Sequence, residues 1–220
     1  MGNPNQRIIV VNTKTLFGNN YFEGFRPAEE FDYESKILSN YQIMRRGSVA
    51  EPKNHPEGNA ERNTEFKQPI GYTMIVNPQF KKVFAYQRSS KDSEYKEKRL
   101  QGKWSWGLGG HIEPFDAENG NPLKKSLLRE VLKEEIEILN ENIQNINILG
   151  YINDDSNSVG KVHFGILYLI ETDGDVKPKD KEIAQGKFTS INELEKICSS
   201  LDYEVETWSK IALGPLRDYF

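Results

Sequence analysis

The clearest hydrophobic pattern along the chain lies between residues 121 and 136, in the segment NPLKKSLLREVLKEEI. Its apolar residues recur three and four positions apart, and a helix gathers such positions on one face. The apolar positions are Leu123, Leu127, Leu128, Val131, Leu132 and Ile136. The pattern predicts an amphipathic helix over these residues.

Runs of β-branched and aromatic residues predict strands on both sides of this helix. Before it lie residues 7–12, 70–77 and 82–88, and after it lie residues 145–153 and 161–171. The runs 70–77 and 82–88 are separated only by PQFK, so we expect them to form an antiparallel pair.

Two further segments predict helices from their first turns. Residues 27–41 begin with Pro27 followed by acids, which suits the start of a helix. Residues 186–197 read as a strand that turns into a helix, with Ser190 as N-cap and Glu193 as its capping-box partner. The chain closes on residues 203–220, for which we expect a helix interrupted near Gly214 and Pro215.

Polar segments separate these elements. Residues 45–69 are rich in Gly, Pro and Asn and predict a long loop, and residues 89–102 form a charged connector. Strands and helices are mixed without strict alternation, which predicts an α+β fold or a sandwich around a mixed sheet.

The composition narrows the function. The chain of 220 residues has a net charge of −4, so no extended nucleic-acid surface is evident. Cys198 is the only cysteine, which leaves no intrachain disulfide and no C-x-x-C zinc pattern. We find no signal peptide and no apolar run of membrane-spanning length, and therefore expect a cytoplasmic protein without a membrane partner.

The segment GGHIEPFDAENGNPLKKSLLREVLKEE resembles the Nudix (MutT-like) box, G-x5-E-x7-R-E-U-x-E-E-x-G-U, where U is apolar. Through LQGKWSWGLGGHI, REVLKEE and YINDDSNSVGKVHFG, the wider chain looks like a predicted phosphoesterase subgroup of that superfamily. The resemblance covers residues 68 to 195. We therefore expect residues 1–66 to form an N-terminal extension packed on the core, and residues 67–220 to form a Nudix-like hydrolase domain.

The resemblance implies a Nudix-type α/β/α sandwich with a mixed β-sheet. It also implies a pyrophosphohydrolase that cleaves a nucleoside diphosphate linked to another group, with Mg²⁺ or Mn²⁺ held by box glutamates. A hard divalent ion with oxygen ligands suits this reaction, because it neutralises pyrophosphate and activates the water that attacks phosphorus. The implied partner is a small nucleotide-type substrate, and the chain is compatible with a homodimer.

The box departs from its pattern by one residue. The family needs glutamates at i, i+3 and i+4, which lie on one helix face. Here Glu130 and Glu134 fit one register, and Glu134 and Glu135 fit the other. In a regular helix Glu135 points about 140° away from Glu130. A π-bulge, which inserts one residue into an α-helix, would bring all three glutamates together as metal ligands.

Lys133 motivates an alternative. It stands at i+3 from Glu130, where the family places a ligand, and an ammonium group there would compete with a cation. The chain would then be a catalytically weak Nudix-like nucleotide-binding or sensing module. A solvated, charged helix face is the simplest structural explanation of REVLKEE.

The resemblance also assigns roles outside the three glutamates. The backbone carbonyl of Gly110 is a candidate metal ligand, and Arg129 is expected to pair with a carboxylate and orient the site. Glu182 is a candidate ligand or catalytic base, alongside Glu130 and Glu134 as catalytic carboxylates. Arg88 and His111 are candidate substrate-binding residues. Each of these residues could equally serve an ordinary structural role.

Three other features have competing readings. Asp116 either stabilises the loop before the helix or is simply exposed. The polar tip around Asn153, Asp154 and Asp155 could reach a ligand, but turn chemistry alone explains its composition. The aromatic residues near the predicted sheet are expected in the core; they are Phe84, Tyr86, Trp104, Trp106 and Phe164.

Overall fold

The computed structural model describes residues 3–91, 98–118, 120–139 and 143–220, and the chain in it divides into two compact units. The first unit comprises Met1–Gly71, Gly110–Leu127 and Gly150–Ile166. The second unit comprises Tyr72–Gly109, Leu128–Leu149 and Leu167–Phe220. Each unit therefore combines segments that are distant in the sequence.

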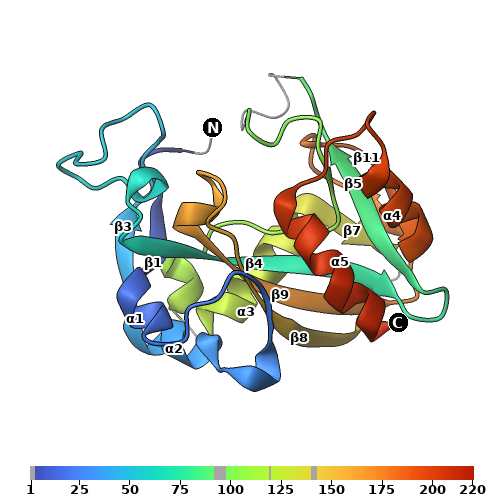
Figure 1. Ribbon diagram of the computed structural model, residues 1–220, viewed down its shortest axis with the longest axis horizontal. Helices are drawn as coiled ribbons and strands as arrows, with labels where there is room; N and C mark the ends of the chain where they lie inside the picture. The colour runs from blue at the N-terminus through green and yellow to red at the C-terminus, as the bar shows by residue number, and fades with distance from the viewer. Residues whose placement is uncertain (1–2, 92–97, 119, 140–142) are drawn as a thin grey trace. The chain divides into compact units, whose positions relative to one another are not determined.

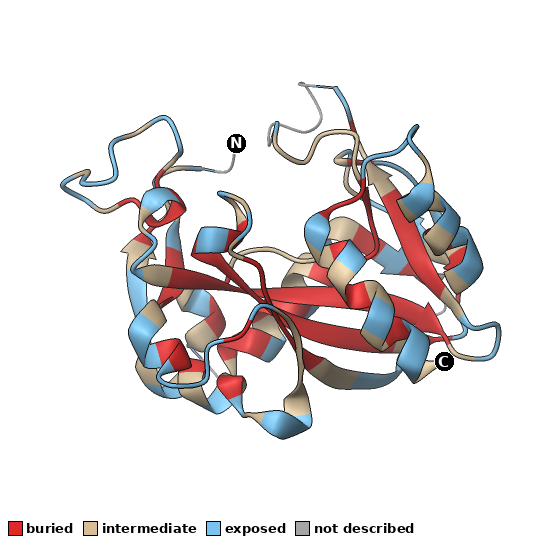
Figure 2. Cartoon of the chain, viewed as in Figure 1, coloured by how far each residue is buried: buried red, intermediate tan, exposed pale blue. Residues whose placement is uncertain are grey.

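Within the described part of the chain nine strands form the main sheet, and hydrogen bonding gives the order β11-β5-β4-β9-β8-β2 along its path. Three long strands contribute residues to both units: β4 (Phe66–Asn77), β8 (Ile143–Asn153) and β9 (His163–Thr172). Figure 2 shows burial along β4 and β9, whose side chains are buried at nearly every position. The predicted α+β class with a mixed sheet is confirmed.

The first unit adds elements from the N-terminal part of the chain. They are β1 (Arg7–Asn12), α1 (Thr13–Phe17), β2 (Gly24–Pro27), η1 (Ala28–Glu30), α2 (Tyr33–Asn40), β3 (Tyr41–Arg45), η2 (Ala60–Arg62), η3 (Pro114–Ala117), α3 (Pro122–Leu127) and η6 (Gly160–Val162). Its core is aromatic, with Phe164 within 5.2 Å of Tyr33 and 5.8 Å of Phe17, measured between ring centroids.

The second unit contains the remaining elements. They are β5 (Lys82–Arg88), β6 (Trp104–Ser105), the π-helix η4 (Leu128–Glu135), β7 (Ile136–Ile138), β10 (Val176–Pro178), β11 (Ile183–Ser190), α4 (Ile191–Ser199) and α5 (Thr207–Tyr219). Helix α4 contacts both β11 and α5, and Figure 1 shows the two helices beside β5 and β11. The antiparallel pairing of β4 with β5, predicted from the sequence, is confirmed at Val76 and Val83.

Most predicted strands are confirmed, but the helix predicted over residues 27–41 begins later. Pro27 ends β2, and α2 starts at Tyr33 because Asp32 caps it by accepting a hydrogen bond from Ser35 N at 2.9 Å. Residues 41–45 form β3, a strand that the sequence reading missed, and its partner is β1, with Tyr41 opposite Val11. A pairing so distant in sequence leaves no local signal.

The predicted interruption of the C-terminal helix is wrong, because α5 continues through Gly214 and Pro215. A proline ring clashes with the Cβ of the preceding residue, and Gly214 has none. Gly214 therefore allows the helix to continue through Pro215, with the loss of the backbone hydrogen bond that proline cannot donate.

The five predicted core aromatics are all buried. The long predicted loop contains η2 and the start of β4, and residues 92–97 of the charged connector lie outside the described residues. Residues 3–66 share the first unit with two later segments, and their assignment as an extension stays a prediction. No helix among the described residues is long and apolar enough to cross a membrane.

The contribution of the capping box at the start of α4 to stability can be measured. Glu193 Oε2 accepts hydrogen bonds from Ser190 N at 2.9 Å and Ser190 Oγ at 2.8 Å. We expect Ser190→Ala to lower the free energy of unfolding by about 1 kcal/mol, measured by urea denaturation. Ser199→Ala, near the exposed end of the same helix, is the control and should change it by less than about 0.5 kcal/mol.

Candidate active site

The helix that carries the box glutamates changes type halfway along. It is α-helical from Pro122 to Leu127 and π-helical from Leu128 to Glu135. The widened turn predicted between Glu130 and Glu135 is therefore confirmed. A π-helix has roughly four and a half residues per turn. Glu134 and Glu135, four and five positions beyond Glu130, therefore lie on the same face of the helix as Glu130.

The helix ends directly in a strand. Ile136 begins β7 and pairs with Pro178 of β10. Among the residues that the structure describes, Lys81 is the only non-glycine with a positive φ, so the helix has no left-handed C-terminal cap. The glycine of the box, which would favour such a cap, is replaced here by Ile136 or Glu137.

Arg129 connects two of the glutamates. Its Nη1 forms an ion pair with Glu130 Oε1 and lies 3.3 Å from Glu134 Oε1. The predicted pairing of Arg129 with a carboxylate is therefore present. Glu130 is largely buried, with 15% of its side chain exposed, whereas Glu134 is 54% exposed. Lys133 is exposed, next to Glu134.

Glu135 differs from both of these glutamates. Its Oε2 is buried and has no hydrogen-bond partner among the described residues. Burial raises the pKa of the Glu135 carboxyl from 4.5 to about 8. Arg88 opposes this rise, and the negative charges of Glu130, Asp180 and Glu182 add to it. Glu135 thus marks a place where negative charge converges on a buried oxygen.

Backbone contacts place the second group of acids beside Glu135. The carbonyl oxygen of Glu135 accepts hydrogen bonds from Lys179 N at 2.9 Å and Asp180 N at 3.3 Å. Asp180 Oδ1 in turn accepts a hydrogen bond from Glu182 N at 2.9 Å. The loop before β11 is therefore tied to the end of the π-helix, which brings Glu182 into the same region.

The strand pair β5–β11 places Arg88 next to Glu182. Ile183 lies opposite Arg88, and the carbonyl oxygen of Glu182 accepts a hydrogen bond from Ser89 N at 2.8 Å. No local pattern in the sequence indicates this proximity, because the strands are far apart along the chain.

Glu206 is a site residue that the sequence analysis missed. It forms an ion pair with Arg88 Nε, and only 10% of the Arg88 side chain and 8% of the Glu206 side chain are exposed. The second oxygen of Glu206 accepts a hydrogen bond from Ser105 Oγ at 3.1 Å, while the Arg88 guanidinium lies 5.4 Å from the ring centroid of Tyr86. Arg88 is thus held in place on two sides.

The donor set fits a hard divalent cation. Its atoms are carboxylate oxygens, which Mg²⁺ and Mn²⁺ prefer over nitrogen or sulfur donors. The unpartnered oxygen of Glu135 and the raised pKa of its carboxyl both indicate negative charge that a cation would compensate. Glu130, Glu134 and Glu135 are the residues that would hold the ion, with Glu182 as a further candidate.

Gly110 and His111 belong to the first unit, whereas the glutamates belong to the second. His111 pairs with Ile70 in a β-bridge, and its Nε2 lies 2.7 Å from Gln68 Oε1. Burial lowers the pKa of His111 well below its usual range. The metal-ligand role of Gly110 and the substrate-binding role of His111 stay predictions.

The remaining polar residues have structural partners. Asp116 is buried, and its Oδ2 accepts a hydrogen bond from Glu113 N at 2.9 Å, so it stabilises the loop. Asp154 Oδ1 accepts from Ser156 N at 3.1 Å, which is the turn chemistry expected of this tip. Asn153 Nδ2 donates to Phe22 O at 2.8 Å, and Asp155 forms an ion pair with Lys67.

Comparison with known proteins gives relatives along nearly the whole chain. Protein YmaB of Bacillus subtilis (strain 168) is 35% identical over 228 residues, covering 99% of this chain and 100% of YmaB. The solved structure of Tm1382, assigned as a Nudix hydrolase, is 26% identical with a TM-score of 0.74, covering 98% of this chain and 100% of that one. DR0079 from Deinococcus radiodurans is 14% identical with a TM-score of 0.55, covering 97% and 98%. No family model matches the chain.

Deleting Lys133 tests the geometry of the π-helix. The shortened segment REVLEEI would place glutamates at i, i+3 and i+4, which a regular α-helix presents on one face. We expect the deletion variant to fold and to bind Mn²⁺ within about tenfold of the wild-type affinity, measured by calorimetric titration. A folded variant that no longer binds Mn²⁺ would contradict this geometry.

Lys133→Glu is the matched control, because it keeps the length of the helix. Lys133 is exposed in the π-helix, so the substitution should leave the affinity for Mn²⁺ nearly unchanged. A clear gain in affinity would instead mean that residue 133 faces the metal.

Proposed function

We propose, from the premise that this chain belongs to the Nudix hydrolase superfamily, that it is a metal-dependent pyrophosphohydrolase acting on phosphoric anhydrides. Its substrate would be a nucleoside diphosphate linked to another group. The observation that carries the proposal is the buried, unpartnered oxygen of Glu135, whose carboxyl has its pKa raised by burial and by the charges of Glu130, Asp180 and Glu182.

Each box residue has a role in this proposal. Glu130, Glu134 and Glu135 would bind Mg²⁺ or Mn²⁺, and Arg129 would orient two of them through the ion pairs that it forms with Glu130 and Glu134. When bound, the ion would neutralise the pyrophosphate and lower the pKa of the attacking water. The carboxylates keep their positions because the helix and the loop before β11 are tied together through the Glu135 carbonyl.

Glu182 is the proposed general base. The influence of its charge on Glu135 supports this role, because a carboxylate near the site could accept the proton of the attacking water. The Glu130 and Glu134 carboxylates stay the other candidates for this step. The leaving phosphate would depart as the P–O bond breaks on the side opposite the attack.

Arg88 is the proposed contact for a substrate phosphate. A guanidinium suits this role because it presents several N–H donors to phosphate oxygens in a fixed plane. Its Nε is bound by Glu206, which sets the orientation of the whole planar group. Glu206 would therefore act as a positioning residue for Arg88.

The alternative, a catalytically weak sensing module, rested on Lys133 as an ammonium group in a ligand position. The π-helix and the exposure of Lys133 support the enzyme over this alternative. That alternative stays as one outcome of the activity test.

The proposals on cellular location, substrate size and oligomeric state rest on the sequence and not on the geometry of the site. We propose a cytoplasmic location, supported by the single cysteine, Cys198, which is free. A small-molecule substrate is supported by the absence of a basic surface signal in a chain with a net charge of −4. A homodimer stays a prediction.

The proposal is tested on a panel of nucleoside diphosphate derivatives with Mg²⁺ or Mn²⁺. We expect Glu134→Gln and Glu135→Gln each to lower kcat about 100-fold or more, because each removes a charge that stabilises the transition state. Glu137→Gln is the control, because Glu137 is exposed on the neighbouring strand β7 and should keep wild-type turnover.

Two results would count against this function. Unchanged kcat in both glutamate variants would remove the metal assignment. Tight nucleotide binding by the wild-type chain without hydrolysis of any substrate on the panel would favour the sensing module.

A further inference from the structure

A second group of metal-ligand side chains lies in the first unit. Glu61, His111 and His163 each offer one ligand atom, and these atoms lie within 4.8 Å of one another. Glu61 and His163 are 6% and 7% exposed, and His111 is partly buried. None of the three belongs to the box helix, and only His111 has a predicted role, substrate binding, in the Nudix chemistry.

The ring of His163 is held in an orientation that suits a ligand. His163 begins β9 directly after η6, and its Nδ1 lies 2.7 Å from the carbonyl oxygen of Val159. A carbonyl oxygen can only accept a hydrogen bond, so Nδ1 carries the proton. The neutral ring then has its lone pair on Nε2, and this second contact to the backbone is typical of metal-binding histidines.

His111 presents its ring to the same point. Its backbone is fixed by the β-bridge with Ile70, and its Nε2 lies 3.4 Å from the Nε2 of His163. Two nitrogens bound to one Zn²⁺ at about 2.0–2.1 Å in a tetrahedral site are separated by about 3.4 Å. The two histidines therefore stand at the spacing that a shared ion requires. An amide oxygen can only accept a hydrogen bond, so His111 Nε2 donates to Gln68 Oε1 in this structure, and an ion would have to displace that proton.

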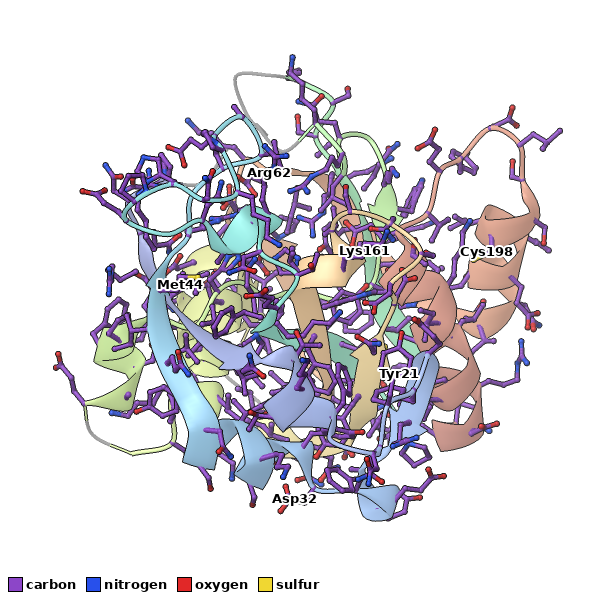
Figure 3. All side chains as sticks on the ribbon, turned by 60° about the vertical axis from the view of Figure 1, so that its left-hand side comes forward. Tyr21, Asp32, Met44, Arg62, Lys161 and Cys198 are labelled. Carbon is purple, nitrogen blue, oxygen red and sulfur yellow. The ribbon has the colours of Figure 1, made fainter. Side chains whose placement is uncertain are left out.

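Glu61 completes the group from a third segment. It lies on η2, which contacts η6, and Figure 3 marks these two short helices by Arg62 and Lys161. Arg46 Nε donates to Glu61 Oε1 at 3.1 Å. A hydrogen bond of this kind orients a metal-binding carboxylate.

Gln68 borders the cluster on the side of His111. Its side chain is 1% exposed, and its Oε1 accepts a hydrogen bond from His111 Nε2 at 2.7 Å. Its amide nitrogen is buried without a hydrogen-bond partner among the described residues. An amide N–H group is a donor and cannot bind a cation, so Gln68 would position His111 and would not hold the ion.

We propose that Glu61, His111 and His163 bind a divalent transition-metal ion, Zn²⁺ foremost, at a site that shares no residue with the box glutamates. Two imidazole nitrogens and one carboxylate oxygen suit Zn²⁺, whereas Mg²⁺ prefers oxygen donors alone. Three protein ligands leave a fourth position open.

A bound ion would also affect the stability of the fold, because its ligands come from separate segments. His111 and His163 are 52 residues apart, and Glu61 comes from the polar segment that precedes β4. An ion held by all three would cross-link these segments of the first unit. Binding would therefore stabilise the segment around η2, which lies in the polar stretch before β4.

The competing explanation is a hydrogen-bonded pair of structural histidines that binds no ion. The experiment uses the full chain carrying Glu134→Gln and Glu135→Gln, which removes the box site, after treatment with EDTA. Co²⁺ replaces Zn²⁺ as the probe, because its visible absorption reports nitrogen coordination directly. We expect one equivalent of Co²⁺ to produce this absorption and Zn²⁺ to abolish it by displacement.

Further substitutions in the same chain assign the ligands. We expect His163→Gln and Glu61→Gln each to weaken Co²⁺ binding by about tenfold or more, as loss of a contact at a metal site does. His55→Gln is the matched control, because His55 lies outside the cluster and its Nδ1 accepts only a local hydrogen bond from Glu57 N at 3.3 Å. Its Co²⁺ spectrum should equal that of the parent chain.

A second measurement covers variants that fold poorly. Zn²⁺ should raise the thermal unfolding midpoint of the parent chain and of His55→Gln, and should raise it less in Glu61→Gln. Absence of Co²⁺ absorption in the folded parent chain, or absorption that survives both His163→Gln and Glu61→Gln, would overturn the proposal and leave a structural histidine pair.

Discussion

A buried carboxyl group loses its hydration, which disfavours its charged form, and neighbouring acids add to this effect. Burial is the main reason that the Glu135 carboxyl holds its proton far more tightly than usual, and the charges of Glu130, Asp180 and Glu182 raise its pKa further. Gathering such charges costs folding free energy. Backbone hydrogen bonds, which do not depend on these charges, hold the acids in place in spite of this cost. A bound cation would offset it.

Two arginines limit the repulsion without removing it. Arg129 pairs with Glu130 and Glu134 on the outer side of the helix, and Arg88 pairs with Glu206 from the strand side. Neither gives Glu135 Oε2 a hydrogen bond. The arrangement thus neutralises the surroundings of the site and leaves the buried oxygen available, which is the distribution of charge that a metal-dependent phosphate site needs.

The two proposed metal sites differ in their donor atoms, and that difference decides which ions they would prefer. The box site offers carboxylate oxygens to a hard ion, whereas the histidine site offers two ring nitrogens and one carboxylate to a softer one. The sites also lie in different units, Glu135 in the second and His163 in the first. Each can therefore be removed by substitution without altering the ligands of the other.

The sequence by itself determined the elements whose causes are local. The capping box at Ser190 and Glu193 was predicted because a stretch of four residues contains all of its chemistry. The widened helix was predicted because the offset of Glu135 from Glu130 can be counted along the chain. Family membership followed from a motif contained in one segment.

The tertiary structure alone decided which distant residues meet. Glu206 binds Arg88 across 118 positions, and His163 faces His111 across 52, with no spacing in the sequence to indicate either contact. The strand β3 was missed for the same reason, since its partner β1 lies far upstream. Hydrogen bonds between strands and side-chain pairs across a sheet depend on chain topology, and a local pattern of residues records propensity rather than topology.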